Sequence, residues 1–358
     1  MTCSQCDDRL IQVLQQVAPG THLREGLERI LRAEKGALVV LGAAPQVQAL
    51  FTGGFRIEVP FTAQRLSELA KMDGALVLDQ AGGNILWANV HLMPDPNIPT
   101  SETGTRHRTA ERVAKQTNVP VVTVSESMHI LTLYLDDLRH VLENVANVLS
   151  RGNQTVQTLE HYRARFDELA GQLTGVELDG TATQRDVLAV LARAEMLCRV
   201  AEELERYVAE LGVDGRLLRL QLDELAVGVD EAKMLVVRDY LPVQNGLGVA
   251  GVLAEVAKLA PEELADPTAL ARVVNLTGDP EALDAVLVPR GYRVLAKVPE
   301  LPGWVIDRVA ERFGSLKVLL TASLEDLEEV EGIGRDRARQ VRDGLGRLAE
   351  ASEVEYYP

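Results

Sequence analysis

At 358 residues, with 46% hydrophobic and 25% charged residues, the chain has the size and composition of a globular protein with two or three domains. No apolar run is long enough to span a membrane, and the first ten residues lack the apolar core of a signal peptide, so we expect a cytoplasmic protein with no membrane partner. The net charge of −16 argues against nucleic-acid binding through a broad basic surface, although a small site of backbone amides and local arginines can still hold phosphate.

Short aliphatic runs alternate with helical spacing over residues 1–140, which predicts a mixed α/β domain built on a mixed sheet. The expected strands are buried runs bounded by glycine or polar residues, and the expected helix repeats its apolar residues every three or four positions. Strands are predicted at 36–42, 75–78, 85–89 and 119–124, and a helix at 61–72.

From Ser127 to about residue 226 the apolar spacing becomes three and four residues, which predicts long helices. The pattern begins with Leu131, Leu135, Leu138 and Leu142 and resumes after a break expected at 175–180. Such stripes are typical of packing seams in a helical bundle. We therefore assign residues 141–286 to an all-α spine that joins the two ends of the chain.

Residues 287–358 contain short helices interrupted by proline and glycine, which predicts a small all-α domain. The segment 299–303 precedes one expected helix and the segment 330–334 precedes another. Two similar helix–turn–helix units are therefore expected in tandem.

The most informative segment for function is Asp73-Gly74-Ala75, where a predicted helix meets a buried strand. Glycine lets the backbone approach a ligand and the carboxylate can reach a divalent metal, although an Asp-Gly pair alone is more typical of a turn. A second segment, Gly104 to Arg112, would begin a helix with an anion site in its first turn. The residues expected at this anion site are Thr105, Arg106, His107, Arg108 and Thr109. The alternative is a solvated basic turn that pairs with Glu111.

These two segments together resemble the paired signature of diadenylate cyclase domains in the DNA integrity scanning family. Three further segments match in order and spacing, which makes a chance match improbable. They are the glycine turn 53–55, the loop 89–94 that abuts the adenine, and the segment 125–127 after the last strand. The resemblance covers roughly the first 140 residues.

The resemblance implies a nucleotidyltransferase that condenses two ATP molecules into cyclic di-AMP without a protein nucleophile. Catalysis would then rest on positioning and electrostatics, with Asp73 and Arg108 as catalytic residues. Asp73 and Glu126 would bind Mg²⁺ or Mn²⁺. The implied nucleotide contacts are Gly74, Ala75, Leu92, Thr105, Arg106, His107, Arg108, Thr109 and Ser125. Because the flanking arginines disfavour the protonated form of His107, we expect it to donate a hydrogen bond to phosphate and not to act as a general base.

One site binds one ATP whereas the product joins two nucleotides, so two protomers are expected to face each other across a twofold axis. The resemblance further implies a homo-octamer.

The segment Gly332-Ile333-Gly334 resembles the turn of a helix-hairpin-helix motif, whose amides bind a DNA phosphate. Arg335 and Arg337 would add local positive charge, and the segment 301–304 looks like a degenerate first hairpin of the pair. Within the family such a module binds branched or junction DNA, which lowers cyclase activity. An ordinary packing hairpin is the alternative.

Two other functions stay open from the sequence. One is a DNA-repair scaffold that binds a nucleotide without reacting. The other is a helix-hairpin-helix nuclease or glycosylase, which is disfavoured because no Lys or Asp arrangement suits base excision. The three cysteines are too sparse for a disulfide framework or a complete zinc site, and we assign no role to Cys3 and Cys6.

Overall fold

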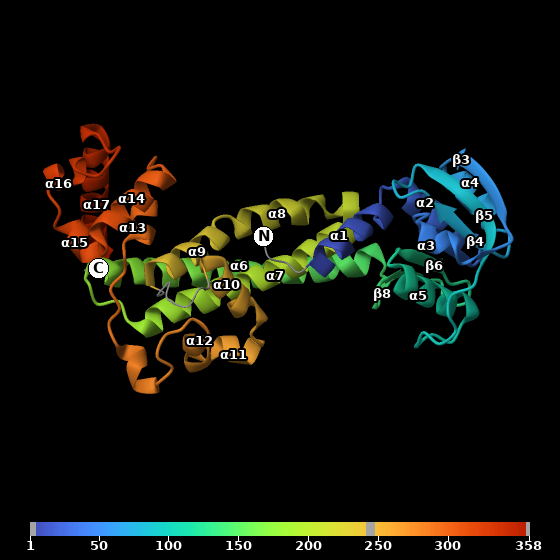
Figure 1. Cartoon of the computed structure of the whole chain (residues 1–358), viewed down its shortest axis with the longest axis horizontal. Helices are drawn as coiled ribbons and strands as arrows, with labels where there is room; N and C mark the ends of the chain where they lie inside the picture. The colour runs from blue at the N-terminus through green and yellow to red at the C-terminus, as the bar shows by residue number, and fades with distance from the viewer. Residues whose placement is uncertain (1–4, 241–247, 356–358) are drawn as a thin grey trace. The chain divides into compact units, whose positions relative to one another are not determined.

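The computed structural model describes residues 5–240 and 248–355, and most of its helices and several of its strands are labelled in Figure 1. The chain forms two compact units. Unit 1 comprises Met1–Thr155 with Glu203–Gln221, and unit 2 comprises Val156–Glu202 with Leu222–Pro358. Over the described ranges, no helix is both long and apolar enough to cross a bilayer. Cys3 lies outside the described residues.

Unit 1 is built on a mixed β-sheet in the order β2-β5-β4-β1-β6-β7-β8, with β3 also paired to β5. β1 and β4 are parallel, and the other strand pairs are antiparallel. The predicted mixed sheet is therefore confirmed. The strands are β1 Ala37–Leu41, β2 Phe51–Thr52, β3 Phe55–Pro60, β4 Ala75–Leu78, β5 Asn84–Leu92, β6 Val121–Val124, β7 Leu131–Leu135 and β8 Leu138–Leu142.

Helices pack on both faces of this sheet because successive residues of a strand point to opposite faces. Val39 belongs to a core with α1, α2 and α4, whereas its neighbour Val40 belongs to a second core with α3 and α5. The helices are α1 Gln5–Val17, α2 His22–Arg32, α3 Pro45–Gln48, α4 Ala63–Leu69 and α5 Thr105–Thr117.

The prediction of a helix from Ser127 onward is wrong for residues 131–142, which form the hairpin β7–β8. Leu135 pairs with Leu138 across a turn made by Asp136, whose φ is 50°, and Asp137. The helical spacing of the leucines is coincidental: β7 also alternates residues between two faces and pairs with β6 along its length. Pairing with an existing sheet decided the outcome, as is common for β-branched and aromatic segments.

The predicted all-α region follows, and its long helices are confirmed. The first continues through the expected break at Gly175 to Leu178. The elements are α6 Val145–Leu178, α7 Gln184–Leu211, η1 Gly212–Gly215, α8 Arg216–Ala226, α9 Val229–Tyr240, α10 Val249–Lys258, α11 Pro261–Ala265, α12 Pro267–Val273 and η3 Pro280–Asp284.

The carboxy-terminal part of unit 2 contains the two expected helix–turn–helix units, α13–α14 and α16–α17, connected by α15. They share one core that includes Val305, Leu327 and Val341. Ser323 caps α16 through reciprocal hydrogen bonds with Asp326, which defines where the second unit begins. The bounds are α13 Tyr292–Ala296, α14 Gly303–Phe313, α15 Leu316–Leu320, α16 Leu324–Glu328 and α17 Arg335–Glu355.

Candidate functional site

Strand directions bring several predicted segments to one edge of the sheet in unit 1. β1 and β4 are parallel, so the residues that precede them, Gly36 and Asp73, lie at the same edge. β6 runs antiparallel to β1, so Ser125, which follows it, lies at this edge too. β5 runs antiparallel to β4 and brings its last residue, Leu92, to the same end. This site lies at the ends of neighbouring strands and not along an outermost strand; we call it the nucleotide edge.

Arg106 connects the start of α5 to the nucleotide edge. Its Nη2 lies 3.4 Å from Oδ1 of Asp73, whose side chain is 99% exposed. A Cβ atom added to Gly36 would lie 2.1 Å from Nη1 of Arg106, so the guanidinium rests against bare backbone. Gly36 was not among the site residues expected from the sequence, although a glycine directly before a buried strand was a visible signal.

Gly74 is required by a close approach between β4 and β5. A Cβ atom at this position would lie 2.6 Å from the Cα and carbonyl carbon of Asn89. Asn89 has a φ of 54° and lies where the register between the two strands shifts. This is a β-bulge, which presses the Asn89 backbone onto Gly74. A contact between Gly74 and a nucleotide stays a prediction.

The first turn of α5 has the properties of an anion site. The helix begins after Gly104, whose carbonyl accepts a hydrogen bond from Arg108 N at 2.9 Å, and its first turn contains no acidic residue. The amides of the first turn have no partner within the helix and carry the positive end of its dipole. Thr105 and Arg108 are exposed there, and the Thr109 hydroxyl donates to the Thr105 carbonyl at 2.9 Å.

His107 differs from its neighbours because its side chain is buried, with 9% exposed. Its ring lies edge-on to Tyr134 at 6.5 Å, and its Nε2 has no hydrogen-bond partner. Burial lowers the pKa of His107, Glu102 opposes this effect, and the charge of Arg106 adds to it. The predicted lowering of the pKa is confirmed, but burial is its main cause.

Glu102 connects the loop before α5 to the hairpin β7–β8 through hydrogen bonds. Its Oε1 accepts hydrogen bonds from the Tyr134 hydroxyl at 2.8 Å and from Arg139 Nε at 2.5 Å. Burial acts to raise the pKa of Glu102, but the two hydrogen bonds and the charge of Arg139 outweigh it, so the pKa is lowered. From α5 itself, Arg112 donates to the carbonyls of Ile98 and Pro96 in the same loop. The start of α5 is thus anchored on both sides, by Arg112 at the end of the predicted segment 104–112 and by Glu102, which was not expected from the sequence.

The remaining predicted site residues differ in whether their side chains are exposed or buried. The hydroxyl of the buried Ser125 accepts a hydrogen bond from Met128 N at 3.3 Å and closes the turn between β6 and β7. Glu126 is exposed in that turn. The side chains of Ala75 and Leu92 belong to the core, so their main chains are what a ligand can contact.

Two carboxylates, Asp73 and Glu126, belong to exposed segments at the nucleotide edge. Within residues 5–240 and 248–355, no group of three or more His, Cys, Asp or Glu side chains is arranged to hold a metal. Mg²⁺ is commonly bound by one or two carboxylates that are completed by substrate phosphates and water. The donor set therefore fits a metal that arrives with the nucleotide.

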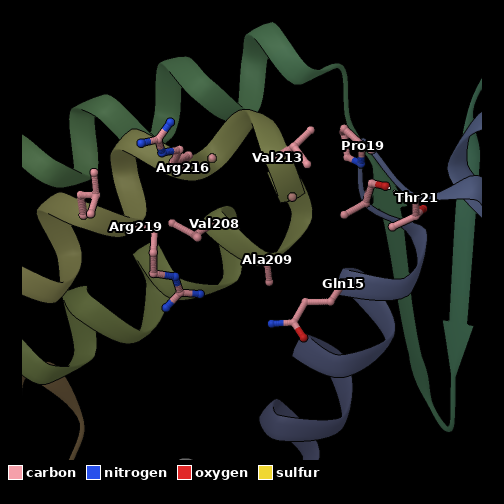
Figure 2. A pocket seen from close by; sticks show the side chains of 13 residues that line it. Gln15, Pro19, Thr21, Val208, Ala209, Val213, Arg216 and Arg219 are labelled. Carbon is pink, nitrogen blue, oxygen red and sulfur yellow. Dashed lines mark hydrogen bonds between the residues drawn. The ribbon is translucent and has the colours of Figure 1, made fainter.

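A hollow of about 430 Å³ elsewhere in unit 1 contains none of the predicted residues (Figure 2). It lies between the turn joining α1 to α2 and the segment from α7 through η1 to α8. Its lining is mostly apolar or glycine, with Arg216 and Arg219 among the labelled side chains. It is therefore distinct from the nucleotide edge.

The predicted DNA-binding turn lies in unit 2 between α16 and α17. Gly332 has a left-handed φ of 81°, and Ile333 is buried in the core. Gly334 precedes α17, Arg335 Nε lies 3.8 Å from Oε1 of Glu328, and Arg337 Nη1 donates to the Gly332 carbonyl at 3.3 Å. The turn has the backbone shape that we predicted; phosphate binding by these residues stays a prediction.

Comparison with known proteins identifies the family. Residues 142–283 match the family described as DisA bacterial checkpoint controller linker region, and residues 24–138 match DisA bacterial checkpoint controller nucleotide-binding. The DNA integrity scanning protein DisA of Parafrankia sp. (strain EAN1pec) is 54% identical over 98% of this chain and 98% of its own length. The chain belongs to the DisA family. The protein of the same name from Streptomyces coelicolor is also 54% identical, over 96% of this chain and 93% of its own.

Family membership confirms the resemblance and the fold class that we expected from the sequence. The chain carries the diadenylate cyclase domain of this family, matched over residues 24–138, followed by the matched linker. The enzyme class predicted from Asp73-Gly74-Ala75 and the segment 104–112 is therefore confirmed.

Proposed function

We propose that this chain joins two ATP molecules into cyclic di-AMP at the nucleotide edges of two facing protomers, and that branched DNA lowers this activity. The observation that carries the proposal is the 3.4 Å approach of Arg106 to the exposed carboxylate of Asp73. A carboxylate suited to a divalent cation and an arginine suited to phosphate thus lie side by side. This pairing suits attack on an α-phosphate, where negative charge must be held and positioned.

The reaction requires no covalent intermediate on the protein. The 3′-oxygen of one ATP bonds to the α-phosphorus of the other, pyrophosphate leaves, and the hydroxyl proton is released. Repeating the step with the roles reversed closes the ring. Asp73 and Glu126 would hold Mg²⁺ or Mn²⁺, which neutralises phosphate charge when bound. Asp73 and Arg108 are the proposed catalytic residues.

The start of α5 is the proposed binding site for the phosphates. Thr105 and Arg108 are exposed at this end of the helix. A phosphate contact by His107 is proposed from the family resemblance; its ring is buried and its Nε2 has no hydrogen-bond partner in the protein. The proposed nucleotide contacts are Gly74, Ala75, Leu92, Thr105, Arg106, His107, Arg108, Thr109 and Ser125.

Ring closure needs a second protomer because one edge binds one nucleotide. Two large apolar side chains flank the nucleotide edge: Met93, directly after β5, is 67% exposed, and Met128, between β6 and β7, is 55% exposed. Exposed methionines beside a polar site favour a face that is covered in an assembly. The octamer is proposed from the family resemblance.

Residues 287–358 are proposed to bind branched or junction DNA, residues 141–286 to form the spine, and residues 1–140 to carry out cyclisation. The proposed DNA contacts are the amides of Gly332, Ile333 and Gly334 with Arg335 and Arg337. The name DNA integrity scanning protein, carried by relatives over nearly the whole length of the chain, supports this assignment. Because Ile333 is buried, its contribution is the backbone amide.

The enzyme proposal is tested by incubating the purified chain with ATP and Mn²⁺ and measuring cyclic di-AMP. We expect Asp73→Asn to abolish product, and Arg108→Ala to lower turnover at least 100-fold by removing phosphate stabilisation, a loss of about 3 kcal/mol. Arg32→Ala is the matched control, because Arg32 is an exposed arginine in the same unit, and it should behave as wild type. Absence of product from the wild-type chain across metals and protein concentrations would favour the non-catalytic scaffold.

A further inference from the structure

An exposed tryptophan lies beside the proposed DNA-binding turn. Trp304, in the first turn of α14, has 41% of its surface exposed. The guanidinium carbons of Arg308 and Arg337 lie over its ring, 5.4 Å and 4.8 Å from the centroid. A large aromatic side chain normally supplies core packing, so its exposure beside two cations indicates a role at the surface.

Both arginines are tied to the turn itself. Arg308 donates a hydrogen bond to the carbonyl of Glu331, and Arg337 donates to the carbonyl of Gly332 at 3.3 Å. A Cβ atom at Gly332 would lie 2.7 Å from Nη1 of Arg308, so the guanidinium packs closely on the turn. Trp304, Arg308 and Arg337 therefore form one surface with it, which we call the tryptophan platform.

The charge of this part of the chain is too balanced to attract DNA by itself. Residues 287–358 contain eleven Lys and Arg residues and thirteen Asp and Glu residues. Binding through the phosphate backbone depends on clustered positive charge, so a duplex gains little long-range attraction here. Local contacts must then supply most of the affinity and the selectivity.

We propose that the tryptophan platform stacks on an unpaired base at the branch point of a DNA whose phosphate is held by the adjacent turn. This inference rests on the proposed DNA function and identifies an unpaired base as the feature of the DNA that the chain recognises. The face of a base is covered by its neighbours in a continuous duplex, whereas an unpaired base at a branch presents an open face. Aromatic rings bind such faces without regard to sequence, and flanking arginines add cation–π and phosphate contacts.

The test compares the full-length wild-type chain with Trp304→Ala and Trp304→Phe, titrated into two labelled DNAs. One is a branched DNA with unpaired bases at its branch, and the other is a blunt duplex of the same length. We expect Trp304→Ala to weaken binding of the branched DNA about 5- to 150-fold, the value of one stacked base, and to leave duplex binding unchanged. Trp304→Phe should retain most of the affinity. Val318→Ala, which removes an exposed apolar side chain from α15, should bind both DNAs as wild type does.

Fluorescence gives a second readout that does not depend on affinity. The chain has two tryptophans, so Trp87→Phe leaves Trp304 as the sole indole. Branched DNA should quench its emission, and the blunt duplex should not. Equal binding of branched DNA by wild type and Trp304→Ala, or no quenching, would overturn the inference and leave the DNA proposal standing. No binding of either DNA by wild type would overturn both.

Discussion

At the scale of single residues, the nucleotide edge depends on two glycines as much as on its charged side chains, because a glycine leaves room for a neighbouring group. Gly36 leaves room for the Arg106 guanidinium, and Gly74 leaves room for the backbone of Asn89. Both glycines act through contact with another segment. Each therefore sets the position of a functional group that lies far away along the chain.

We predict that Gly36→Ala lowers cyclic di-AMP formation at least tenfold. The added methyl would lie 2.1 Å from Nη1 of Arg106, so the guanidinium must leave the position from which it contacts Asp73. A loss of about 1.4 kcal/mol of transition-state stabilisation corresponds to this change. The measurement is kcat/KM for ATP, with thermal unfolding as a check on folding. Gly83→Ala is the control, because the nearest atom to its added methyl is 3.8 Å away. Wild-type kinetics for Gly36→Ala would remove Gly36 from the site.

At the scale of secondary-structure elements, buried carboxylates hold helix ends in place. Asp239, in the last turn of α9, accepts hydrogen bonds at 2.7 Å from the amides of Gly291, Tyr292 and Arg293 at the start of α13. The Arg293 side chain in turn donates to Glu177 of α6 at 2.9 Å. The carboxy-terminal helices are thereby joined to the long helices of unit 2 through groups that are out of water.

This arrangement predicts a pH dependence of stability. Burial raises the pKa of Asp239 from 3.8 to about 6; the hydrogen bonds from the three backbone amides oppose this shift, and the nearby charge of Glu177 adds to it. The folded state therefore favours the protonated carboxyl more than the unfolded chain does. The resulting stabilisation is complete below pH 3.8 and is lost as the pH rises through 6. The free energy of unfolding of wild type, relative to Asp239→Asn, should fall by up to about 3 kcal/mol between pH 4 and pH 7.

Urea unfolding of wild type and Asp239→Asn at pH 4, 5.5 and 7 measures the difference between their free energies of unfolding. The contributions of the other titrating groups cancel in this difference, because both proteins contain those groups. Asp223→Asn, an exposed carboxylate on α8, is the control and should show no such trend. A difference between wild type and Asp239→Asn that is constant or grows with pH would contradict the assigned pKa.

At the scale of the whole molecule, we propose that DNA recognition in unit 2 regulates an ATP reaction in unit 1. The two proposed activities are assigned to separate compact units, so a change confined to the proposed DNA-binding turn should leave the basal reaction intact. Gly332 suits this test because its φ of 81° disfavours any other residue and because Arg308 packs against it.

We predict that Gly332→Val, made in the full-length chain, keeps cyclase activity in the absence of DNA and loses inhibition by branched DNA. The valine distorts the turn that offers its amides to phosphate. The measurement is cyclic di-AMP formation over a titration of branched DNA. Gly346→Ala, at an open position on α17, should remain inhibited. Undiminished inhibition of Gly332→Val would separate the turn from regulation.

The sequence by itself determined the family, the enzyme class and most of the elements. The reason is that Asp73-Gly74-Ala75 and the segment 104–112 are local patterns whose chemistry can be recognised before folding. It failed at residues 131–142, where leucines at helical spacing form β7 and β8 because an adjacent strand was available to pair with them.

The tertiary structure alone decided how these patterns meet. Arg106 reaches Asp73 because parallel and antiparallel pairing bring the ends of four strands to one edge, which spacing along the chain does not reveal. The same packing buries His107 and lowers its pKa mainly by removing it from water, an effect stronger than the neighbouring charges that the sequence displays. Burial and proximity depend on distances between segments remote in sequence, and folding sets those distances.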